Sequence, residues 1–181
     1  MLLIRGGRVI DPVREVDEIM DVMIEGSQIV ETGKALKVPA DAEVIDATGL
    51  VVAPGLMDAH VHFRDPGLTY KEDIETGAAA AARGGFTTVV CMANTKPVVD
   101  NLETLSCVQE KGEQTPIHVL QAAAITKGLQ GKELVDMEAL ADAGAAGFTD
   151  DGIPLMDEKL LVQAMEQAKA LGFPFAFHEE D

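Results

Sequence analysis

Basic residues and long apolar runs are what this sequence most conspicuously lacks. Lysine and arginine number 14, against 31 aspartate and glutamate residues, which gives a formal net charge of −17 at pH 7. A surface this acidic repels the phosphates of nucleic acids and of anionic lipids. A membrane-spanning helix needs about 18 apolar residues in a row, and no apolar run in the sequence approaches that length. We therefore expect no nucleic acid and no membrane among the partners.

Cysteine is also scarce. The two cysteines, Cys91 and Cys107, stand alone, without the Cys-x-x-Cys spacing of metal or redox motifs. Isolated cysteines of this kind indicate reduced, buried thiols in a cytoplasmic protein. The N-terminus meets a charge at Arg5, too early for a signal peptide. The sequence therefore predicts a soluble, cytoplasmic chain.

Apolar residues, by contrast, are plentiful enough for a core, at 47% of the 181 residues. That length suits one domain, or one domain with a small appendage. In residues 1–53, short β-prone runs are separated by turn residues such as Gly6-Gly7 and Asp11-Pro12. The predicted strands are 2–4, 8–10, 21–24, 28–32 and 43–45. We expect residues 1–53 to form a small β segment.

Residues 54–181 show a different pattern, in which apolar strands alternate with amphipathic helices. The predicted strands are 50–63, 86–92, 117–123, 145–149 and 175–178, and the predicted helices are 71–83, 101–111, 133–143 and 157–171. Asp100 and Asp157 are placed to cap the second and fourth helices, and Gly172 to end the fourth. Such alternation with short connections predicts a parallel sheet with helices on its faces.

The stretch from Gly55 to Gly67 carries the strongest chemical signal. Because side chains alternate along a strand, His60 and His62 project from one face, and Arg64 follows two residues later. A single histidine would most often be a satisfied core residue, but two on one face of a rigid strand are poorly explained by packing. Neutral imidazole is a preferred ligand of zinc and similar ions. The pair therefore predicts a divalent metal site.

Other polar residues are expected near this pair. Right-handed crossovers place the carboxyl ends of parallel strands at one rim, where the catalytic residues of (β/α)8 barrels gather. The polar residues near predicted strand ends are His60, His62, Asn94, Asp150, Asp151 and His178. Strand parity prevents Asp150 and Asp151 from both facing the site, but it does not choose between them. Either could instead cap the turn before Gly152.

Six stretches form an ordered set of motifs: Pro54–Gly67, Glu75–Gly77, Ala82–Thr88, Met92–Pro97, Phe148–Gly152 and His178–Asp181. This set resembles the amidohydrolase superfamily and, within it, the class I dihydroorotases of pyrimidine biosynthesis. The resemblance implies the N-terminal part of a (β/α)8 TIM barrel over residues 54–181, with about five of its eight strands. It also implies that residues 1–53 are a small β-sandwich segment. The expected reaction interconverts (S)-dihydroorotate and N-carbamoyl-L-aspartate.

The resemblance also implies roles for single residues. Ligands of one or two zinc ions are matched by His60, His62, Asp151 and His178. Arg64 and Asn94 match residues that hold the substrate carboxylate, with His62 beside the substrate. A metal of this kind makes bound water nucleophilic near neutral pH and polarises the ring carbonyl, while a planar guanidinium suits a carboxylate. The proton-shuttling Asp of the family has no match here, so no catalytic acid–base residue is predicted in this chain.

Plainer interpretations of some residues stay open. Arg64 would also serve in a surface salt bridge, although its place two residues after His62 makes that weaker. Asn94 would also serve as a turn residue before Lys96-Pro97. His118 lies in the middle of a predicted strand and is expected to be structural. Asp58 shares the face of the two histidines and is a candidate for supporting them.

Two other functions compete with dihydroorotase. Related hydantoinases and allantoinases bridge their metals through a carboxylated lysine at strand four, whereas Gly147–Asp151 contains no lysine. That difference favours dihydroorotase over these cyclic amidases. A non-catalytic subunit that scaffolds aspartate carbamoyltransferase should have lost metal ligands, and the predicted ligands are retained. A homodimer is a further open possibility.

The number of residues suggests an incomplete barrel. A complete (β/α)8 barrel takes about 250 residues, about twice the length of residues 54–181. We expect about three strand–helix units of the barrel to be absent, which leaves sheet edges open. The sequence therefore predicts a chain that by itself binds metal weakly and has no measurable turnover.

Overall fold

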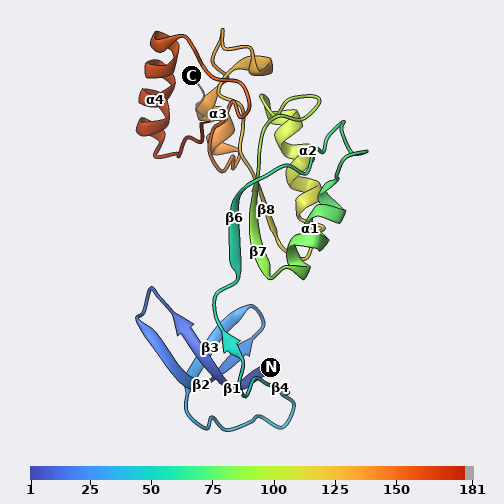
Figure 1. Cartoon of the computed structure of the whole chain (residues 1–181), viewed down its shortest axis with the longest axis vertical. Helices are drawn as coiled ribbons and strands as arrows, with labels where there is room; N and C mark the ends of the chain where they lie inside the picture. Colours follow the sequence, from blue (N-terminus) through green and yellow to red (C-terminus); the bar gives the residue numbers. More distant parts are fainter. Residues whose placement is uncertain (178–181) are drawn as a thin grey trace. The chain divides into compact units, whose positions relative to one another are not determined.

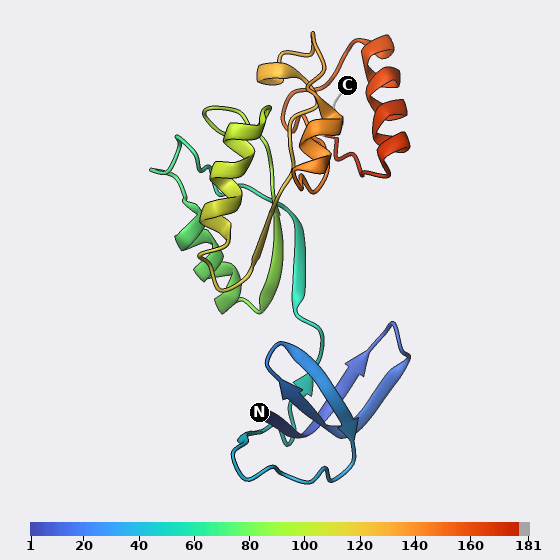
Figure 2. The ribbon, with the colours of Figure 1, turned by 180° about the vertical axis from the view of Figure 1, so that it is seen from behind.

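In a computed structural model that describes residues 1–177, the chain divides into two compact units, Met1–Pro54 and Gly55–Asp181. Figure 1 and Figure 2 show the elements of both units from opposite sides. Within the described residues, no helix is both long enough and apolar enough to span a lipid bilayer.

The first unit is a five-stranded sheet. Its strands are β1 (Leu2–Asp11), β2 (Val16–Glu25), β3 (Gln28–Gly33), β4 (Glu43–Asp46) and β5 (Val51–Val52). β1 pairs antiparallel with β2, and parallel with β4 and then with β5. The two short strands predicted within residues 2–10 are one strand, because the register shift between Ile4 and Gly7 is a bulge and not a break. Gly6, at φ +68°, donates its N–H to the buried carboxylate of Asp21 at this bulge (2.8 Å).

The second unit has the predicted alternation of strands and helices. Its strands β6 (Leu56–Val61), β7 (Phe86–Cys91) and β8 (His118–Gln121) form a parallel sheet in the order β6-β7-β8. The helical elements are α1 (Ile74–Arg83), α2 (Leu102–Gly112), the 3-10 turn η1 (Lys127–Leu129), α3 (Met137–Asp142) and α4 (Glu158–Leu171). α1 contacts β7, α2 contacts β8, and the two helices lie beside each other, as both views show (Figure 1, Figure 2).

Within residues 1–177, the predicted fourth and fifth strands are reduced to single bridges. Phe148 forms single parallel bridges to Ala123 and to Phe175. As far as residue 177, the order of segments therefore continues beyond β8 through single bridges and not through a regular strand. Alanine and glycine, which have low β propensity, occupy residues 143–147. Their composition explains why the pairing is confined to the neighbourhood of Phe148.

The start of α2 differs from the prediction by one residue. Asn101, and not Asp100, is the cap, because Asn101 Oδ1 accepts a hydrogen bond from Thr104 N (3.0 Å). The Asp100 carboxylate instead accepts from Gly128 N (2.8 Å). Asp100 therefore holds the turn that contains η1 and does not cap the helix.

The last two helices show one difference and one agreement. α3 is shorter than the helix predicted there, because Leu134 pairs with Thr126 in an antiparallel bridge and Asp136 then caps the helix. α4 is capped by Asp157 as predicted, and it ends at Gly172 in the left-handed conformation (φ +74°).

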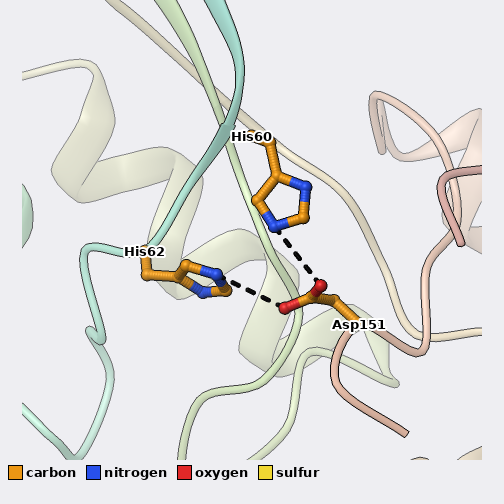
Figure 3. A group of neighbouring side chains, drawn as sticks. All are labelled: His60, His62 and Asp151. Carbon is orange, nitrogen blue, oxygen red and sulfur yellow. Dashed lines mark ion pairs between the residues drawn. The ribbon is translucent and has the colours of Figure 1, made fainter. Parts of the chain in front are cut away.

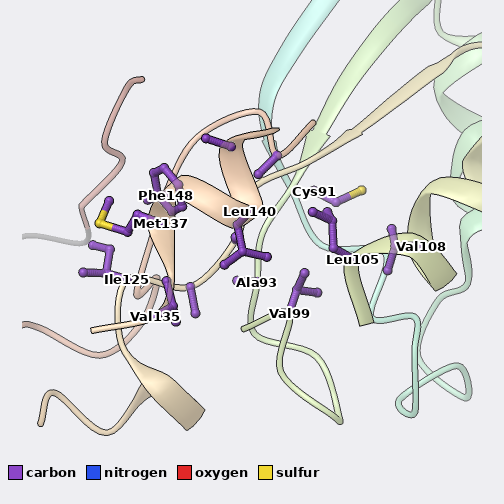
Figure 4. Close-up of a cluster of buried hydrophobic side chains, with 14 of the residues drawn as sticks. Cys91, Ala93, Val99, Leu105, Val108, Ile125, Val135, Met137, Leu140 and Phe148 are labelled. Carbon is purple, nitrogen blue, oxygen red and sulfur yellow. The ribbon is translucent and has the colours of Figure 1, made fainter. Parts of the chain in front are cut away.

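The core of the second unit extends from β7 and α2 to α3 and the segment around Phe148 (Figure 4). Val89 of β7 and Leu105 of α2 are among its fully buried residues. Gly77 of α1 lets the ring of Phe63 pack against that helix, because a Cβ atom at Gly77 would lie 2.4 Å from Phe63 Cδ1. The segment that follows β6 is thereby held against α1.

The two cysteines lie in different environments. Cys91 is buried in this core, and its burial raises the pKa of the thiol to about 12. Cys107 is exposed, because α2 turns Leu105 and Val108 towards the core and Cys107 away from it. The prediction of two buried thiols is therefore wrong for Cys107.

Candidate metal centre

Two histidines and one carboxylate from distant parts of the chain meet at the carboxyl end of β6 (Figure 3). His60 lies in β6, and His62 follows the end of the strand. Asp151 Oδ1 is 3.3 Å from His60 Nε2, and Asp151 Oδ2 is 3.3 Å from His62 Nε2. One carboxylate therefore faces both imidazole rings, whose centroids are 5.1 Å apart.

These three side chains have the spacing of a metal site. The ligand atoms of His60, His62 and Asp151 all lie within 4.8 Å of one another. Donor atoms around a tetrahedral zinc ion, with bonds of about 2.0–2.2 Å, are about 3.4 Å apart. The distance of 3.3 Å from the carboxylate to each imidazole agrees with that value. The exposed fractions of the His60 and Asp151 side chains are 45% and 6%, so the group opens to solvent on the His60 side.

Asn94 connects the histidines, the carboxylate and Arg64. Its Nδ2 donates to Asp151 Oδ2 (2.9 Å), and its Oδ1 accepts from Arg64 Nη1 (3.2 Å). A carboxylate only accepts and a guanidinium only donates, so these neighbours determine which way the amide faces. His62 Nδ1, at 3.0 Å from Asn94 Oδ1, must then donate. The lone pair of His62 is left on Nε2, and its repulsion of the facing carboxylate oxygen would be relieved by a cation between them.

The surroundings of His62 favour its neutral form. Burial has the largest influence and lowers the pKa of His62 below its usual 6.5; the hydrogen bond with Asn94 acts in the opposite direction, and the charge of Arg64 lowers the pKa further. Metal binding requires an unprotonated imidazole nitrogen. At neutral pH, His62 is therefore in the protonation state that a metal needs.

Asp150 and Asp151 have separate tasks. Asp150 Oδ1 accepts hydrogen bonds from Ile125 N (2.7 Å) and Thr126 N (3.1 Å), and Thr126 Oγ1 donates to Asp150 Oδ2. These bonds tie the segment after β8 to the segment that carries Asp151. Burial raises the pKa of Asp150, and the hydrogen bonds from Thr126 and Ile125 oppose that rise. The structure turns Asp151 towards the histidines and Asp150 away from them.

Arg64 lies three residues after the end of β6 and has a left-handed backbone conformation, at φ +59°. Its Nη1 lies 3.2 Å from Asn94 Oδ1 and 3.4 Å from the Asn94 carbonyl oxygen. Within residues 1–177, no hydrogen bond or ion pair engages the Nε–Nη2 edge of this guanidinium. With respect to these residues, the edge is open to an anion beside the histidines.

Comparison with known proteins gives this geometry a family. A family model described as dihydro-orotase-like matches residues 49–181, well over half of the chain. The chain belongs to the dihydro-orotase-like family. It is 61% identical to the dihydroorotase of Clostridioides difficile (strain 630) and 55% identical to that of Clostridium acetobutylicum, in each case over all 181 residues. It spans 43% of the length of each of these curated relatives.

Solved structures agree on the fold. The chain superposes on the L-hydantoinase (dihydropyrimidinase) of Arthrobacter aurescens with a TM-score of 0.85 and 22% identity, covering 99% of this chain and 41% of the other. For the D-hydantoinase (dihydropyrimidinase) of a Thermus species, the TM-score is 0.77 at 30% identity, covering 100% of this chain and 40% of the other. The prediction of a partial (β/α)8 barrel preceded by a small β segment is confirmed by these likenesses.

Three other histidine and carboxylate predictions have different outcomes in this member of the dihydro-orotase-like family. His178 lies outside the described residues. His118 begins β8 and is exposed, away from the group around Asp151. Asp58 supports His60 through the backbone, because its Oδ1 accepts a hydrogen bond from His60 N (3.0 Å).

Sequence reasoning missed the pair formed by Asp65 and Lys111. Lys111 Nζ lies 2.6 Å from Asp65 Oδ1, although the two residues are 46 positions apart. Lys111 belongs to α2 and carries no motif that would have singled it out. Asp65 was visible only as part of the stretch that follows the two histidines.

Proposed function

We propose that this chain carries the zinc-binding and carboxylate-binding residues of a dihydroorotase, the enzyme that interconverts (S)-dihydroorotate and N-carbamoyl-L-aspartate in pyrimidine biosynthesis. The observation that carries the proposal is the grouping of His60, His62 and Asp151, with Asn94 and Arg64 in hydrogen-bond contact beside them. Curated dihydroorotases that match the whole chain at 51–61% identity support it.

We infer that zinc is the cofactor and that His60, His62 and Asp151 hold it, with His178 as a further predicted ligand. Two imidazoles and a carboxylate are donor types that zinc takes in catalytic sites. When bound, zinc would activate a water molecule and polarise the carbonyl group of the cyclic amide. The proposal covers one or two zinc ions, since the family resemblance gives Asp151 a place between two metal positions.

The other residues bind and orient. Asn94 holds the Nδ1–H of His62, so that Nε2 of this ring is presented to the metal. The Nε–Nη2 edge of Arg64 would pair with the substrate carboxylate in the bidentate geometry that a guanidinium offers. Asn94 Nδ2 already donates to Asp151 Oδ2 (2.9 Å) and to the Asp151 carbonyl oxygen (3.3 Å), so its hydrogen bond to the substrate carboxylate would replace the longer of these. His62 would lie beside the substrate. We assign no catalytic acid–base residue to this chain.

The activity is tested in the protein expressed from its complete gene. We expect zinc-dependent hydrolysis of dihydroorotate, loss of activity on treatment with a chelator, and recovery on adding zinc. The Asp151→Ala variant should lose zinc and activity together, while the Cys107→Ser variant should keep both. Faster hydrolysis of hydantoin or allantoin than of dihydroorotate would indicate a hydantoinase or allantoinase instead. The likeness to the D-hydantoinase structure makes this the alternative to test. Absence of both zinc and hydrolysis of any cyclic amide would favour a non-catalytic subunit.

Several expectations stay predictions. Purified residues 1–181 are predicted to show no turnover, which the same assay measures. The cytoplasmic location, a homodimer and association with aspartate carbamoyltransferase also stay predictions. Co-purification and size-exclusion chromatography of the protein from its complete gene would test the last two.

A further inference from the structure

An ion pair between a buried carboxylate and a half-exposed lysine adjoins the proposed carboxylate-binding arginine. Asp65 is the residue after Arg64, and its side chain is only 6% exposed. Its Oδ1 accepts a hydrogen bond of 2.6 Å from Lys111 Nζ, in the last turn of α2. The bond raises the pKa of Lys111, so that the amine is charged at neutral pH. Without Lys111, a buried carboxylate would lose the charge that compensates it.

The segment between Arg64 and Leu68 is tightly closed. Leu68 N donates to Arg64 O (2.9 Å), so the chain turns back on itself within five residues. Arg64 takes φ +59°, a left-handed conformation that is unfavourable for a residue with a Cβ atom. Such a conformation persists only where the surrounding contacts hold it. The Asp65–Lys111 pair is one of those contacts and adjoins the strained residue.

The same segment packs directly on the segment that carries Asn94. Lys96 N donates to Pro66 O (3.0 Å). Gly67 lies at φ +85°, and a Cβ atom there would be 1.7 Å from Lys96 O. The two backbones are therefore in contact where one presents Arg64 and the other presents Asn94. A displacement of Asp65 would be transmitted to the contact between Arg64 Nη1 and Asn94 Oδ1.

We propose that Lys111 is a positioning residue for substrate binding, which acts through Asp65 to hold Arg64 in register with Asn94. Among the described residues, Lys111 pairs with Asp65 and forms no hydrogen bond or ion pair with His60, His62 or Asp151. This inference rests on the proposed function, because Arg64 and Asn94 are assigned there to the substrate carboxylate. It adds to that function a residue of an outer helix that controls the affinity for an anionic substrate.

Steady-state kinetics on the protein from its complete gene test the proposal. For Lys111→Met, we expect the KM for dihydroorotate to rise about tenfold with a much smaller change in kcat, because a carboxylate contact is weakened. Zinc content should not change. Lys111→Arg keeps the charge and should restore KM to within about threefold of the unsubstituted protein. The matched control is Lys127→Met, which removes the lysine of an exposed ion pair with Glu133 and should leave KM unchanged.

A double-mutant cycle separates positioning from simple support of the fold. If Lys111 acts through Arg64, Lys111→Met should raise KM no further once Arg64 has been replaced by Met. Additive effects of the two substitutions would overturn the proposal. So would an unchanged KM in Lys111→Met, with a loss confined to the apparent kcat in proportion to lost folded protein, which thermal unfolding measures.

A second measurement does not depend on activity. Hydrogen exchange of the backbone amides over residues 64–70 should be faster in Lys111→Met than in Lys127→Met, since the Leu68 N–H to Arg64 O bond would open more often. If the unsubstituted protein does not hydrolyse dihydroorotate, the proposed function fails. The positioning role of Lys111 is then tested by hydrogen exchange alone. Equal exchange in the two variants would overturn that role in either case.

Discussion

The two ends of the parallel strands in the second unit use similar residue types for different purposes. At the carboxyl ends, three separate strand–helix units supply His60, Asn94 and Asp151. His60 and Asn94 both contact the Asp151 carboxylate. At the amino ends, His118 begins β8 exposed to solvent, and Gly85 makes the turn before β7. In a parallel sheet the carboxyl ends collect side chains from many parts of the sequence. A histidine is therefore a candidate ligand or a surface residue according to the strand end at which it lies.

Replacing a histidine by alanine at each end in turn should give the largest difference in activity and zinc content. We expect His60→Ala to lower the activity of the protein from its complete gene about a thousandfold or more, because a zinc ligand is lost. His118→Ala should leave zinc content and activity unchanged. Metal analysis after dialysis against a chelator, together with the hydrolysis assay, would measure both. Equal zinc loss in the two variants would remove the distinction between the two ends.

Two glycines with nearly the same backbone angle sharpen the comparison. Gly67, near the carboxyl ends, has φ +85° with Lys96 O in the way of a Cβ atom, whereas Gly85 has φ +86° with open space. Gly85→Ala should cost about 1–2 kcal/mol of unfolding free energy for the left-handed conformation alone. Gly67→Ala should cost about 1–3 kcal/mol more, because the backbones must separate. Denaturant unfolding would show the difference, and equal costs would mean that the contact with Lys96 is readily relieved.

Buried hydrogen bonding at the carboxyl ends should matter more than exposed bonding at the amino ends. Asp150→Asn disturbs a buried group that accepts three hydrogen bonds, and it should cost about 1–3 kcal/mol of unfolding free energy. It should also weaken zinc binding about tenfold, since Asp150 orients the segment that carries Asp151. Gln109→Ala, which removes the exposed bond to Ala143 O, should cost only about 0.5 kcal/mol. Unfolding curves and zinc titrations on both variants would test this, and equal costs would contradict it.

The smallest expected effect is on the pH dependence of stability. The pKa of His62 is lowered by burial, so below about pH 6.5 the unfolded chain binds more protons than the folded one. The metal-free protein should therefore lose stability as the pH falls from about 7 through 6.5 towards the lowered pKa. His62→Asn should flatten this part of the curve. The raised pKa of Asp150 acts with the opposite sign at lower pH, so unfolding is best measured between about pH 5.5 and 7.5. A slope unchanged in His62→Asn would exclude His62 as its source.

Much of the fold was predictable because local physics governs it. The alternation of apolar runs placed β6, β7 and β8 in a parallel sheet, and Asp157 and Gly172 bounded α4 by cap chemistry that acts within a few residues. The errors arose where several local choices were nearly equal. Asp100 and Asn101 are both good caps, and the competing contact of Asp100 with Gly128 comes from a distant segment.

The candidate site divides in the same way. His60 and His62 were predictable as a pair, because two side chains on one face of a strand need no information from elsewhere. The contact of Asn94 with both His62 and Asp151 was not predictable from the residues alone, because three separate chain segments have to meet to create it. The role of Lys111 was not predictable from the sequence, because it depends on Asp65, which is 46 positions away.

The sequence by itself determined the types of side chain available for chemistry and the strand on which the two histidines share a face, because strand periodicity is a property of neighbouring residues. The tertiary structure decided that Asp151 and not Asp150 faces them, that Asn94 orients the His62 ring, and that Lys111 stands behind Arg64. These depend on how strands and helices pack in three dimensions. Packing is settled by the sum of many weak contacts across the chain, which no single stretch of sequence contains.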